Sequence, residues 1–317
     1  MELAAVGSFL AGGRPLTVSG RPKTLVSYST GLQDMEHDPN GEFWIEQAYV
    51  QYFIPTRRRF AALLLLVHGG GLTGAVWETK PDGGPGWLSW FLEAGIATYV
   101  IDNAERGRAG FCAHEDVWTN QPIVRSNEEA WSLYRFGQAR DFASRTPFPG
   151  QQFPIEAMDG LARMTVPRWP ANGPMMLAGL KAAIARIGRC IVLGHSQGGG
   201  LAMAAALEMP DEVLACILVE PHGLPTVMDR AAVRGRSSLL MMGDFITFSP
   251  AWQELGRKAE MAQRQWGDAS GRAETLDLPG RGLRGNSHMP MMDRNSDAVA
   301  ALLVEWLDQE HWAFQLV

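Results

Sequence analysis

Short apolar runs alternate with helical segments from residue 61 onward, and this alternation limits the fold more than any other feature. Strands that are apolar on both sides must be covered on both faces, and strands that alternate with helices form parallel β-α-β units. We therefore expect an α/β fold with a mostly parallel central sheet and helices on both faces. The expected strands are 61–67, 96–101, 190–193, 213–219, 238–242 and 275–278, and the expected helices are 86–94, 174–187, 197–208, 250–265 and 297–308.

Two regions depart from this alternation. The N-terminal region predicts strands at 7–18 and 46–54. About 90 residues separate the second and third buried strands, which is too long for a plain crossover. We expect one domain over residues 1–317, with a cap inserted at about 112–172 that contains a helix at 127–136. Caps over open sheets commonly roof a pocket. Trp118 and Trp169 in the cap, and Trp77 near the glycine motif at 68–71, are candidates either for pocket walls or for core packing.

Length and charge exclude several classes of protein. The chain has 317 residues, 46% hydrophobic residues and 20% charged residues, so it can bury a large core and is not a mainly disordered chain. Its net charge is 28 − 34 = −6. An acidic chain lacks the basic surface that nucleic acids and anionic lipids require. We therefore expect a small-molecule partner, and neither nucleic acid nor membrane.

Targeting and metal signals are weak. No uncharged apolar run reaches the length of a membrane-spanning helix, and Glu2 lies where a signal peptide needs basic residues. These features predict a cytoplasmic protein, or a periplasmic or secreted one if a signal peptide has been removed. Cys112, Cys190 and Cys216 form no Cys-x-x-Cys pair, so we expect no zinc site, and we expect no other metal or cofactor.

The strongest chemical motif is Gly194-His195-Ser196-Gln197-Gly198. It matches Gly-x-Ser-x-Gly and lies between an expected buried strand and an expected helix. In this nucleophile elbow a sharp strand-to-helix turn exposes the serine hydroxyl at the edge of the sheet. The sequence therefore predicts Ser196 as a catalytic nucleophile.

A second motif follows the first buried strand, in His68-Gly69-Gly70-Gly71. Attack on an ester places negative charge on the carbonyl oxygen, and two preorganised backbone amides can stabilise that charge. We expect one amide from Gln197, and the other from Gly70 or Gly71. The spacing of Gly69, Gly71 and Gly74 also fits a dinucleotide fingerprint, but no acid lies clearly in the setting that would bind the ribose, although Asp102 ends the following strand. The downstream elbow argues against that alternative.

Serine needs a neighbouring base, and His288 is the best candidate among seven histidines. It lies in a loop between the last short strand and the closing helix. His37 and His114 are disfavoured because they precede the elbow, and His68 and His195 because each lies inside one of the two motifs. His222 follows a strand end too closely, and His311 lies beyond the last helix.

The acid that orients the base has two candidates. Glu220 follows the expected strand 213–219, and Asp244 follows the next strand. Strand position favours Asp244, whereas the carboxylate of Glu220 lies in an apolar run, where a charge needs a partner. The residues alone leave the two candidates nearly equal.

Further motifs extend over most of the chain: Val6-Gly7-Ser8-Phe9, Gly12-Gly13-Arg14, His68-Gly69, Leu72-Thr73-Gly74, Trp77-Glu78-Thr79, Pro81-Asp82-Gly83, Gly86-Trp87, Tyr99-Val100-Ile101-Asp102, Arg106-Gly107-Arg108, Gly194-His195-Ser196-Gln197 and Glu220-Pro221. With these motifs the chain resembles the α/β-hydrolase superfamily, and within it the serine esterases of the bacterial esterase 713 group. The resemblance implies a homodimeric serine esterase, a glutamate as the acid, which favours Glu220, and oxyanion donation from Gly70.

The combined hypothesis is a serine hydrolase that cleaves a carboxylic ester through an acyl-enzyme on Ser196, with His288 and Glu220 as its partners. The same residues could hydrolyse a lactone, a carbamate or an amide. A non-catalytic ligand receptor of the same fold is a further alternative, but it would be expected to lack one of these residues.

Overall fold

The computed structural model describes residues 1–114 and 117–310. Within these residues a mixed sheet has the strand order β1-β4-β6-β5-β7-β8-β9-β10. The pairs β1/β4 and β4/β6 are antiparallel, whereas every pair from β6 through β5 to β10 is parallel. The strands are β1 (Leu3–Val18), β4 (Gly41–Pro55), β5 (Leu63–Val67), β6 (Thr98–Asp102), β7 (Cys190–His195), β8 (Val213–Val219), β9 (Ser237–Met242) and β10 (Arg272–Asp277).

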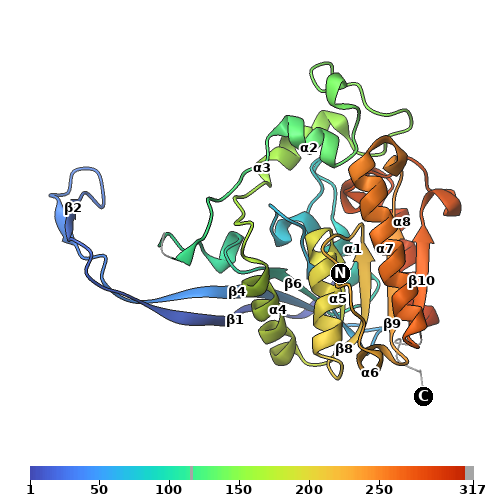
Figure 1. Cartoon of the computed structure of the whole chain (residues 1–317), viewed down its shortest axis with the longest axis horizontal. Helices are drawn as coiled ribbons and strands as arrows, with labels where there is room; N and C mark the ends of the chain where they lie inside the picture. Colours follow the sequence, from blue (N-terminus) through green and yellow to red (C-terminus); the bar gives the residue numbers. More distant parts are fainter. Residues whose placement is uncertain (115–116, 311–317) are drawn as a thin grey trace.

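Helices cover both faces of this sheet (Figure 1). Side chains of α1 and α8 share one core cluster with Leu64 and Leu66 of β5. Side chains of α4, α5 and α7 share the other cluster with Leu65 and Val67 of the same strand. Alternate residues of a strand point to opposite faces, so a continuous apolar run builds both clusters. The helices are α1 (Trp87–Glu93), α4 (Gly173–Ile187), α5 (Gln197–Glu208), α6 (Arg230–Val233), α7 (Pro250–Asp268) and α8 (Ser296–Gln309).

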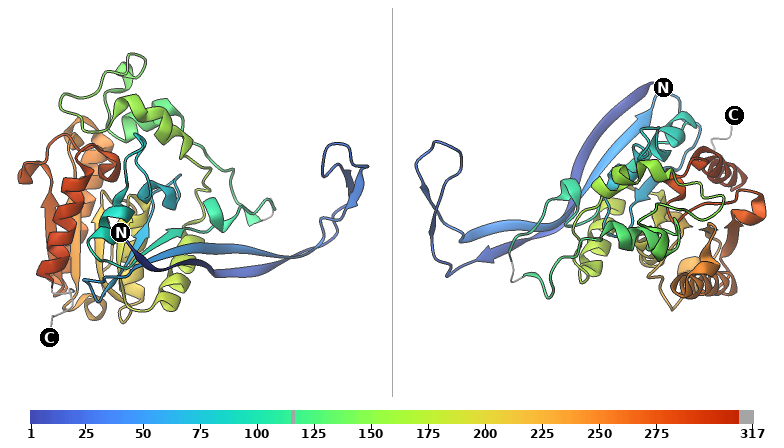
Figure 2. Two further views of the ribbon diagram at one scale, coloured as in Figure 1. Left: turned by 180° about the vertical axis from the view of Figure 1, so that it is seen from behind. Right: turned by 90° about the horizontal axis from the view of Figure 1, so that it is seen from above.

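A connection between β6 and α4 crosses above the carboxyl ends of the parallel strands (Figures 1 and 2). It contains α2 (Asn127–Leu133) and α3 (Met158–Arg163), and its chain returns toward the sheet before α4 begins. Helix α2 ends before the expected boundary at residue 136 because Arg135 adopts a left-handed backbone conformation with φ of 58°. Helices α3 and α6 were not expected; both are too short to show a helical period.

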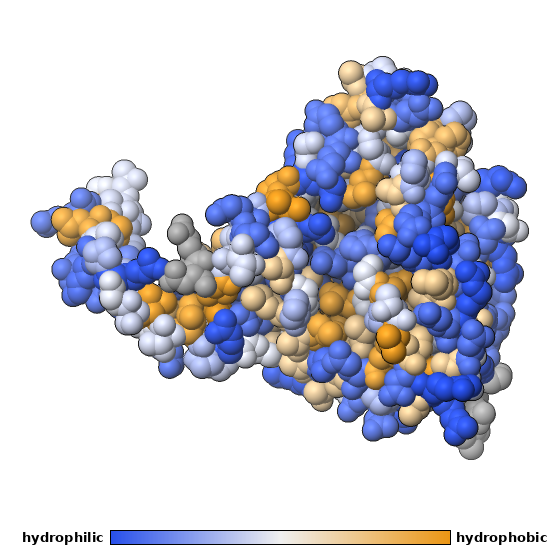
Figure 3. Space-filling model, in the orientation of Figure 1, coloured by the Kyte–Doolittle hydropathy of each residue, from blue (hydrophilic) through white to orange (hydrophobic). Residues whose placement is uncertain are grey.

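The hairpin of β1 and β4 projects far beyond the body of the molecule (Figure 2). Its end carries a small two-stranded sheet of β2 (Thr24–Val26) and β3 (Met35–His37), which the sequence analysis did not predict. The space-filling view shows apolar patches along this projection (Figure 3). We call residues 10–44 of this hairpin the arm. The exposed apolar side chains of the arm are Leu10, Leu25, Tyr28, Leu32, Met35 and Trp44.

Candidate active site

Ser196 occupies the turn between β7 and α5. Its backbone is strained, with φ of 55° and ψ of −118°, and its amide donates a hydrogen bond to the carbonyl of Val219 (2.9 Å). The turn is so tight that a Cβ on Gly194 would lie 2.1 Å from the carbonyl oxygen of Gly198. Only glycine fits at position 194, and the turn directs the serine hydroxyl away from the sheet edge.

His288 reaches Ser196 from a loop before α8. The distance between His288 Nε2 and Ser196 Oγ is 3.0 Å. Two backbone contacts hold this loop: the His288 amide donates to the Tyr134 carbonyl (2.9 Å), and His195 Nε2 lies 2.8 Å from the His288 carbonyl oxygen. His195, inside the elbow, therefore positions the loop that carries the candidate base.

A buried carboxylate stabilises the same loop from behind. Asp293 accepts hydrogen bonds from the Ser287 amide (2.8 Å), the Ser287 hydroxyl (2.7 Å) and Asn286 Nδ2 (3.0 Å). Burial raises the pKa of Asp293 to about 7, even though these hydrogen bonds act in the opposite direction. The loop is thus fixed on both sides of His288.

Glu220 follows β8 and lies next to the other ring nitrogen of His288. Its Oε2 is 3.4 Å from His288 Nδ1, which is longer than an ideal hydrogen bond. Arg135 donates two parallel hydrogen bonds to the carboxylate, from Nη1 to Oε2 (2.8 Å) and from Nη2 to Oε1 (2.7 Å). The Gly243 amide adds a further hydrogen bond to Oε1 (2.5 Å). This buried, fully bonded carboxylate has a fixed position beside the imidazole.

The protonation states follow from burial and neighbouring charge. Burial alone would raise the pKa of Glu220, but the charge of Arg135 and the hydrogen bonds from His288 and Arg135 outweigh it and lower the pKa to about 2. Burial lowers the pKa of His288, as do the charges of Arg135 and Arg125, while Glu220 opposes them. Near neutral pH the pair therefore consists of an ionised Glu220 and a neutral His288, the state in which an imidazole accepts a proton.

Arg135 was missed by the sequence analysis. It is 1% exposed, and its Nε donates to the Asp244 carbonyl (2.8 Å) in addition to the two bonds to Glu220. A signal was present in the sequence: the residue lies between Tyr134 and Phe136, and a charge among aromatic residues needs a buried partner. Nothing local identifies that partner, because Glu220 is 85 positions later in the chain.

Asp244, the other acid candidate, has different partners. Its carboxylate accepts hydrogen bonds from the amides of Phe245 (2.8 Å) and Gly285 (3.1 Å). The Asp244 amide donates to the carbonyl of Asn286 (2.9 Å). The structure thus places Asp244 in the support of the His288 loop and places Glu220 beside the ring.

The other histidines differ in position and burial. His68 is buried and accepts at Nε2 from the Asn103 amide (3.1 Å), and burial lowers its pKa to about 4. His222 lines the cavity at Ser196, and burial lowers its pKa to about 4 as well. His37 lies on β3 and His114 packs against Phe43, both remote from the elbow, while His311 lies outside the described residues.

The glycine loop lies against the elbow. Gly70 lines the cavity that contains Ser196, and Gln197 is the first residue of α5, where its amide has no carbonyl partner within the helix. Asp102, the residue that a dinucleotide site would need, accepts hydrogen bonds from the Gly74 amide (2.6 Å) and from Arg108 Nε (2.8 Å). Its carboxylate stabilises the loop and does not face an open pocket.

A cavity of about 260 Å³ opens beside Ser196. Trp252 forms one wall, with its ring centroid 4.4 Å from that of His288. Trp77 is fully buried against Trp87, and Trp118 stacks on Trp169 (4.2 Å between centroids), so these candidates for pocket walls belong to packing clusters. The residues that line the cavity are Gly70, Leu72, Arg125, Leu133, Tyr134, Arg168, His195, Ser196, His222, Trp252, Leu255 and His288.

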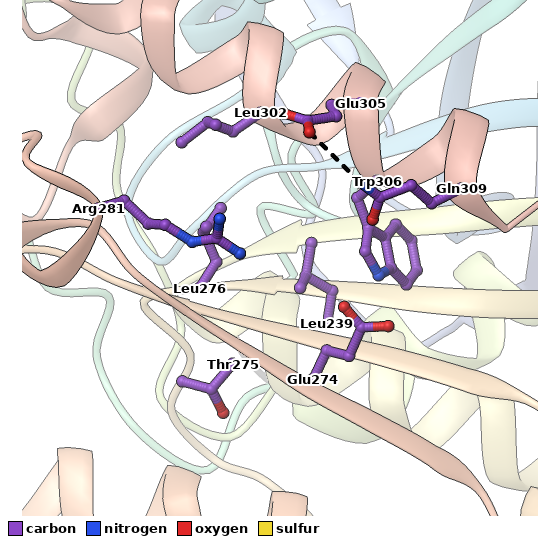
Figure 4. Close-up of a pocket in the computed structure, with 9 residues that line it drawn as sticks. All are labelled: Leu239, Glu274, Thr275, Leu276, Arg281, Leu302, Glu305, Trp306 and Gln309. Carbon is purple, nitrogen blue, oxygen red and sulfur yellow. Dashed lines mark hydrogen bonds between the residues drawn. The ribbon is translucent and has the colours of Figure 1, made fainter.

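Another hollow lies between β10 and α8, away from these residues (Figure 4). It measures about 40 Å³ and includes Glu274, Arg281 and Trp306 in its wall. That volume holds one or two water molecules, so it is too small for an ester substrate.

Comparison with known proteins identifies the family. A family model described as the alpha/beta hydrolase fold matches residues 183–265, the stretch that contains the elbow and Glu220. A solved bacterial esterase superposes with a TM-score of 0.82 and shares 31% identity, over 97% of this chain and 96% of the esterase. The chain belongs to the α/β-hydrolase family. The fold expected from the sequence is therefore confirmed, as is the resemblance to esterases of this family.

A curated relative extends the likeness of this α/β hydrolase to lipases. It is named probable secreted lipase phiG, from a fungal species (strain ATCC 74256), and it is 21% identical over 83% of this chain and 86% of its own length. In residues 1–114 and 117–310, no helix has both the length and the apolar character needed to cross a membrane. Because that relative is named as secreted, a cytoplasmic location remains a prediction.

Proposed function

We propose that this α/β hydrolase cleaves a carboxylic ester through an acyl-enzyme on Ser196. The observation that carries the proposal is the 3.0 Å contact between Ser196 Oγ and His288 Nε2 at the strained turn after β7. A serine hydroxyl becomes a nucleophile when a neutral imidazole at this distance accepts its proton. The similarity to a bacterial esterase and to a lipase supports an ester as the substrate.

The reaction proceeds in two halves. Ser196 Oγ attacks the carbonyl carbon while His288 Nε2 takes the hydroxyl proton, and His288 then gives this proton to the leaving alcohol. In the second half His288 removes a proton from water, the resulting hydroxide attacks the acyl carbon, and the proton returns to Ser196. Glu220 stabilises the imidazolium in both halves, and Arg135 positions Glu220.

Backbone amides stabilise the negative charge that forms on the carbonyl oxygen. We assign one donor to Gln197, at the start of α5, and the other to Gly70, which lines the cavity at Ser196. Gly71 is the alternative to Gly70, but its carbonyl accepts a hydrogen bond from Val166 (2.9 Å) and it lines a neighbouring cavity. In known enzymes one such donor contributes about 3–4 kcal/mol to stabilisation of the transition state.

We further propose that residues 112–172 act as a cap over the active site. This region supplies Arg125, Leu133, Tyr134 and Arg168 to the lining of the cavity that contains Ser196. Because the cap is one connection inserted between β6 and α4, it can form a wall of the pocket and exclude water while the central sheet stays unchanged.

The arm supports the proposal of a homodimer. Its apolar side chains are mostly exposed; Leu25 and Trp44, for example, are 72% and 61% exposed. Clustered apolar surface of this kind marks an interaction site, and most soluble oligomers are symmetric dimers. We propose that the arm packs on a second copy of the chain.

Substitutions of the three site residues test the proposed mechanism. In Ser196→Ala, kcat for an aryl ester is expected to fall by about 10⁴-fold or more, with an unchanged circular dichroism spectrum. Glu220→Gln is expected to lower kcat by about 10⁴-fold, whereas Asp244→Asn keeps most of the activity. Full activity in Ser196→Ala would reject the mechanism, and loss of activity in Asp244→Asn alone would reject the assignment of Glu220.

A further inference from the structure

Two cavities adjoin at the active site. The cavity at Ser196 is about 260 Å³, and a neighbouring cavity of about 330 Å³ is lined by the 123–125 and 165–168 segments. Four residues line both of them: Gly70, Arg125, Tyr134 and Arg168. These four residues therefore lie at the junction, where a ligand in either cavity would contact them.

Arg168 has no counter-ion at this junction. Its Nε is buried without a hydrogen-bond partner, and no ion pair joins its guanidinium to any of the residues that the structure describes. Arg125, in contrast, precedes α2 and pairs with Glu129 in the first turn of that helix. Burial, and then the charge of Arg125, lower the pKa of Arg168, while Tyr134 and Glu129 act in the opposite direction.

The guanidinium of Arg168 lies against the oxyanion loop. A Cβ on Gly70 would be 2.4 Å from Arg168 Nη1 and 3.1 Å from Gln197 Oε1. The glycine at position 70 thus leaves room for the arginine head group. A group bound to Arg168 is consequently only a few bonds from a carbonyl held by the Gly70 amide.

Acids balance part of the positive charge in this region, because Glu129, which pairs with Arg125, lines the neighbouring cavity. Within residues 1–114 and 117–310, the lining of the cavity at Ser196 includes two arginines and neither aspartate nor glutamate. Glu220 is already neutralised by Arg135. Arg106, which is 1% exposed and lines neither cavity, has three guanidinium nitrogens without a hydrogen-bond partner among the described residues. Burial and the charge of Arg168 lower its pKa to about 10, while Glu105 acts in the opposite direction.

We propose that the substrate is an ester that carries a carboxylate within a few bonds of the scissile carbonyl, and that Arg168 binds this carboxylate. Half-esters of short dicarboxylic acids are the simplest members of this class. The planar fork of a guanidinium matches a carboxylate with two parallel hydrogen bonds. A neutral ester would instead bury Arg168 further without a partner, which is unfavourable. This inference rests on the proposed esterase function and adds a substrate class to it.

Matched pairs of esters test the proposal on the full-length protein. Monomethyl succinate is compared with methyl 4-oxopentanoate, in which a methyl group replaces the carboxylate oxygen. Acetoxyacetate is compared with acetoxyacetone, which places the carboxylate on the alcohol side. In at least one pair we expect kcat/KM to be about ten- to hundredfold higher for the charged ester. Added salt should reduce this ratio because it screens the charges.

Variants assign the preference to Arg168. The ratio of charged to neutral kcat/KM should fall to about one in Arg168→Gln and to an intermediate value in Arg168→Lys, which keeps the charge but not the fork. Arg163→Gln is the matched control, because Arg163 is exposed and lines neither cavity. The salt dependence of the wild-type protein provides the test if Arg168→Gln does not fold.

Three results would overturn the inference. They are a wild-type ratio of one or less in both pairs, a ratio that Arg168→Gln leaves unchanged, and an equal loss in Arg168→Gln for charged and neutral esters. The last result would assign Arg168 to the transition state and not to the substrate. In all three cases turnover of neutral esters would leave the proposed function intact. Absence of turnover for every ester, with no labelling of Ser196 by a fluorophosphonate, would reject the function itself.

Discussion

At the scale of single residues, the site depends on a charge network that is larger than a serine, a histidine and an acid. Glu220 is buried and ionised, and Arg135 balances its charge. A buried carboxylate that faced His288 alone would be costly to desolvate. Ser196 and His288 could be nominated from the sequence because motif and chain order limit them, whereas Glu220 was favoured over Asp244 by the resemblance to known esterases. Arg135 could not, because its role depends on a contact made only in the folded chain.

The pH dependence of activity should report this network. In the proposed mechanism neutral His288 accepts the serine proton, so kcat/KM is expected to rise with pH as His288 loses its own proton. Because burial and two arginines lower the pKa of His288 from its ordinary 6.5, the midpoint of the acid limb should lie below pH 6.5. Arg125→Gln removes one of the charges that lower this pKa and should shift the limb to higher pH.

The profile of kcat/KM against pH for a neutral aryl ester measures both effects. Arg163→Gln, an exposed arginine outside the cavities, serves as the control and should leave the midpoint in place. A wild-type midpoint above pH 6.5, or a shift to lower pH in Arg125→Gln, would contradict this account of the base.

At the scale of elements, the core of the sheet could be read from the sequence more easily than its connections. The expected helix 197–208 and strand 213–219 have the same bounds as α5 and β8, because each is a continuous run with a clear end. Strand β10 was expected at 275–278 and lies at Arg272–Asp277, and helix α3 was not expected. The first is mostly exposed and the second has six residues, so neither shows a clear hydrophobic period.

The junction of β7 and α5 should be the element least tolerant of added volume. Gly194→Ala would place a Cβ 2.1 Å from the Gly198 carbonyl, so we expect a loss of about 3 kcal/mol or more in the free energy of unfolding. Gly173→Ala is the control, because a Cβ at Gly173 has no neighbour within 4 Å at the start of α4. That change should be neutral or stabilise by up to about 1 kcal/mol. Urea unfolding measures both, and equal stability of the two variants would refute the steric argument.

At the scale of the whole molecule, the arm is the feature that the sequence predicted least well. The sequence indicated short strands at 7–18, with a turn at Gly12-Gly13, and a strand with apolar alternation at 46–54. It did not indicate that β1 is continuous and extends with β4 as a hairpin beyond the body. Periodicity reports burial, but six large apolar side chains of the arm are exposed in a single chain. Their pattern is consistent with burial in an interface. The sequence of one chain does not show which residues a second chain covers.

The proposed homodimer would bury the apolar side chains of the arm that are exposed in a single chain. Sedimentation velocity should give the mass of a dimer for the wild-type chain and of a monomer for Leu25→Ser combined with Trp44→Ser, because these substitutions remove apolar area from the arm. Val227→Ser is the control, since this residue is 78% exposed but lies outside the arm. A wild-type monomer, or a double variant that remains a dimer, would exclude the arm as the dimer interface.

The whole account depends on one activated hydroxyl, and covalent labelling tests it most directly. A fluorophosphonate should add one phosphonyl group to the wild-type protein as Ser196 Oγ displaces fluoride, and the increase in mass should map to the peptide that contains Ser196. Ser196→Ala should remain unlabelled under the same conditions. An unlabelled wild-type protein, or a Ser196→Ala variant that is labelled equally well, would contradict the assignment of Ser196 as the nucleophile.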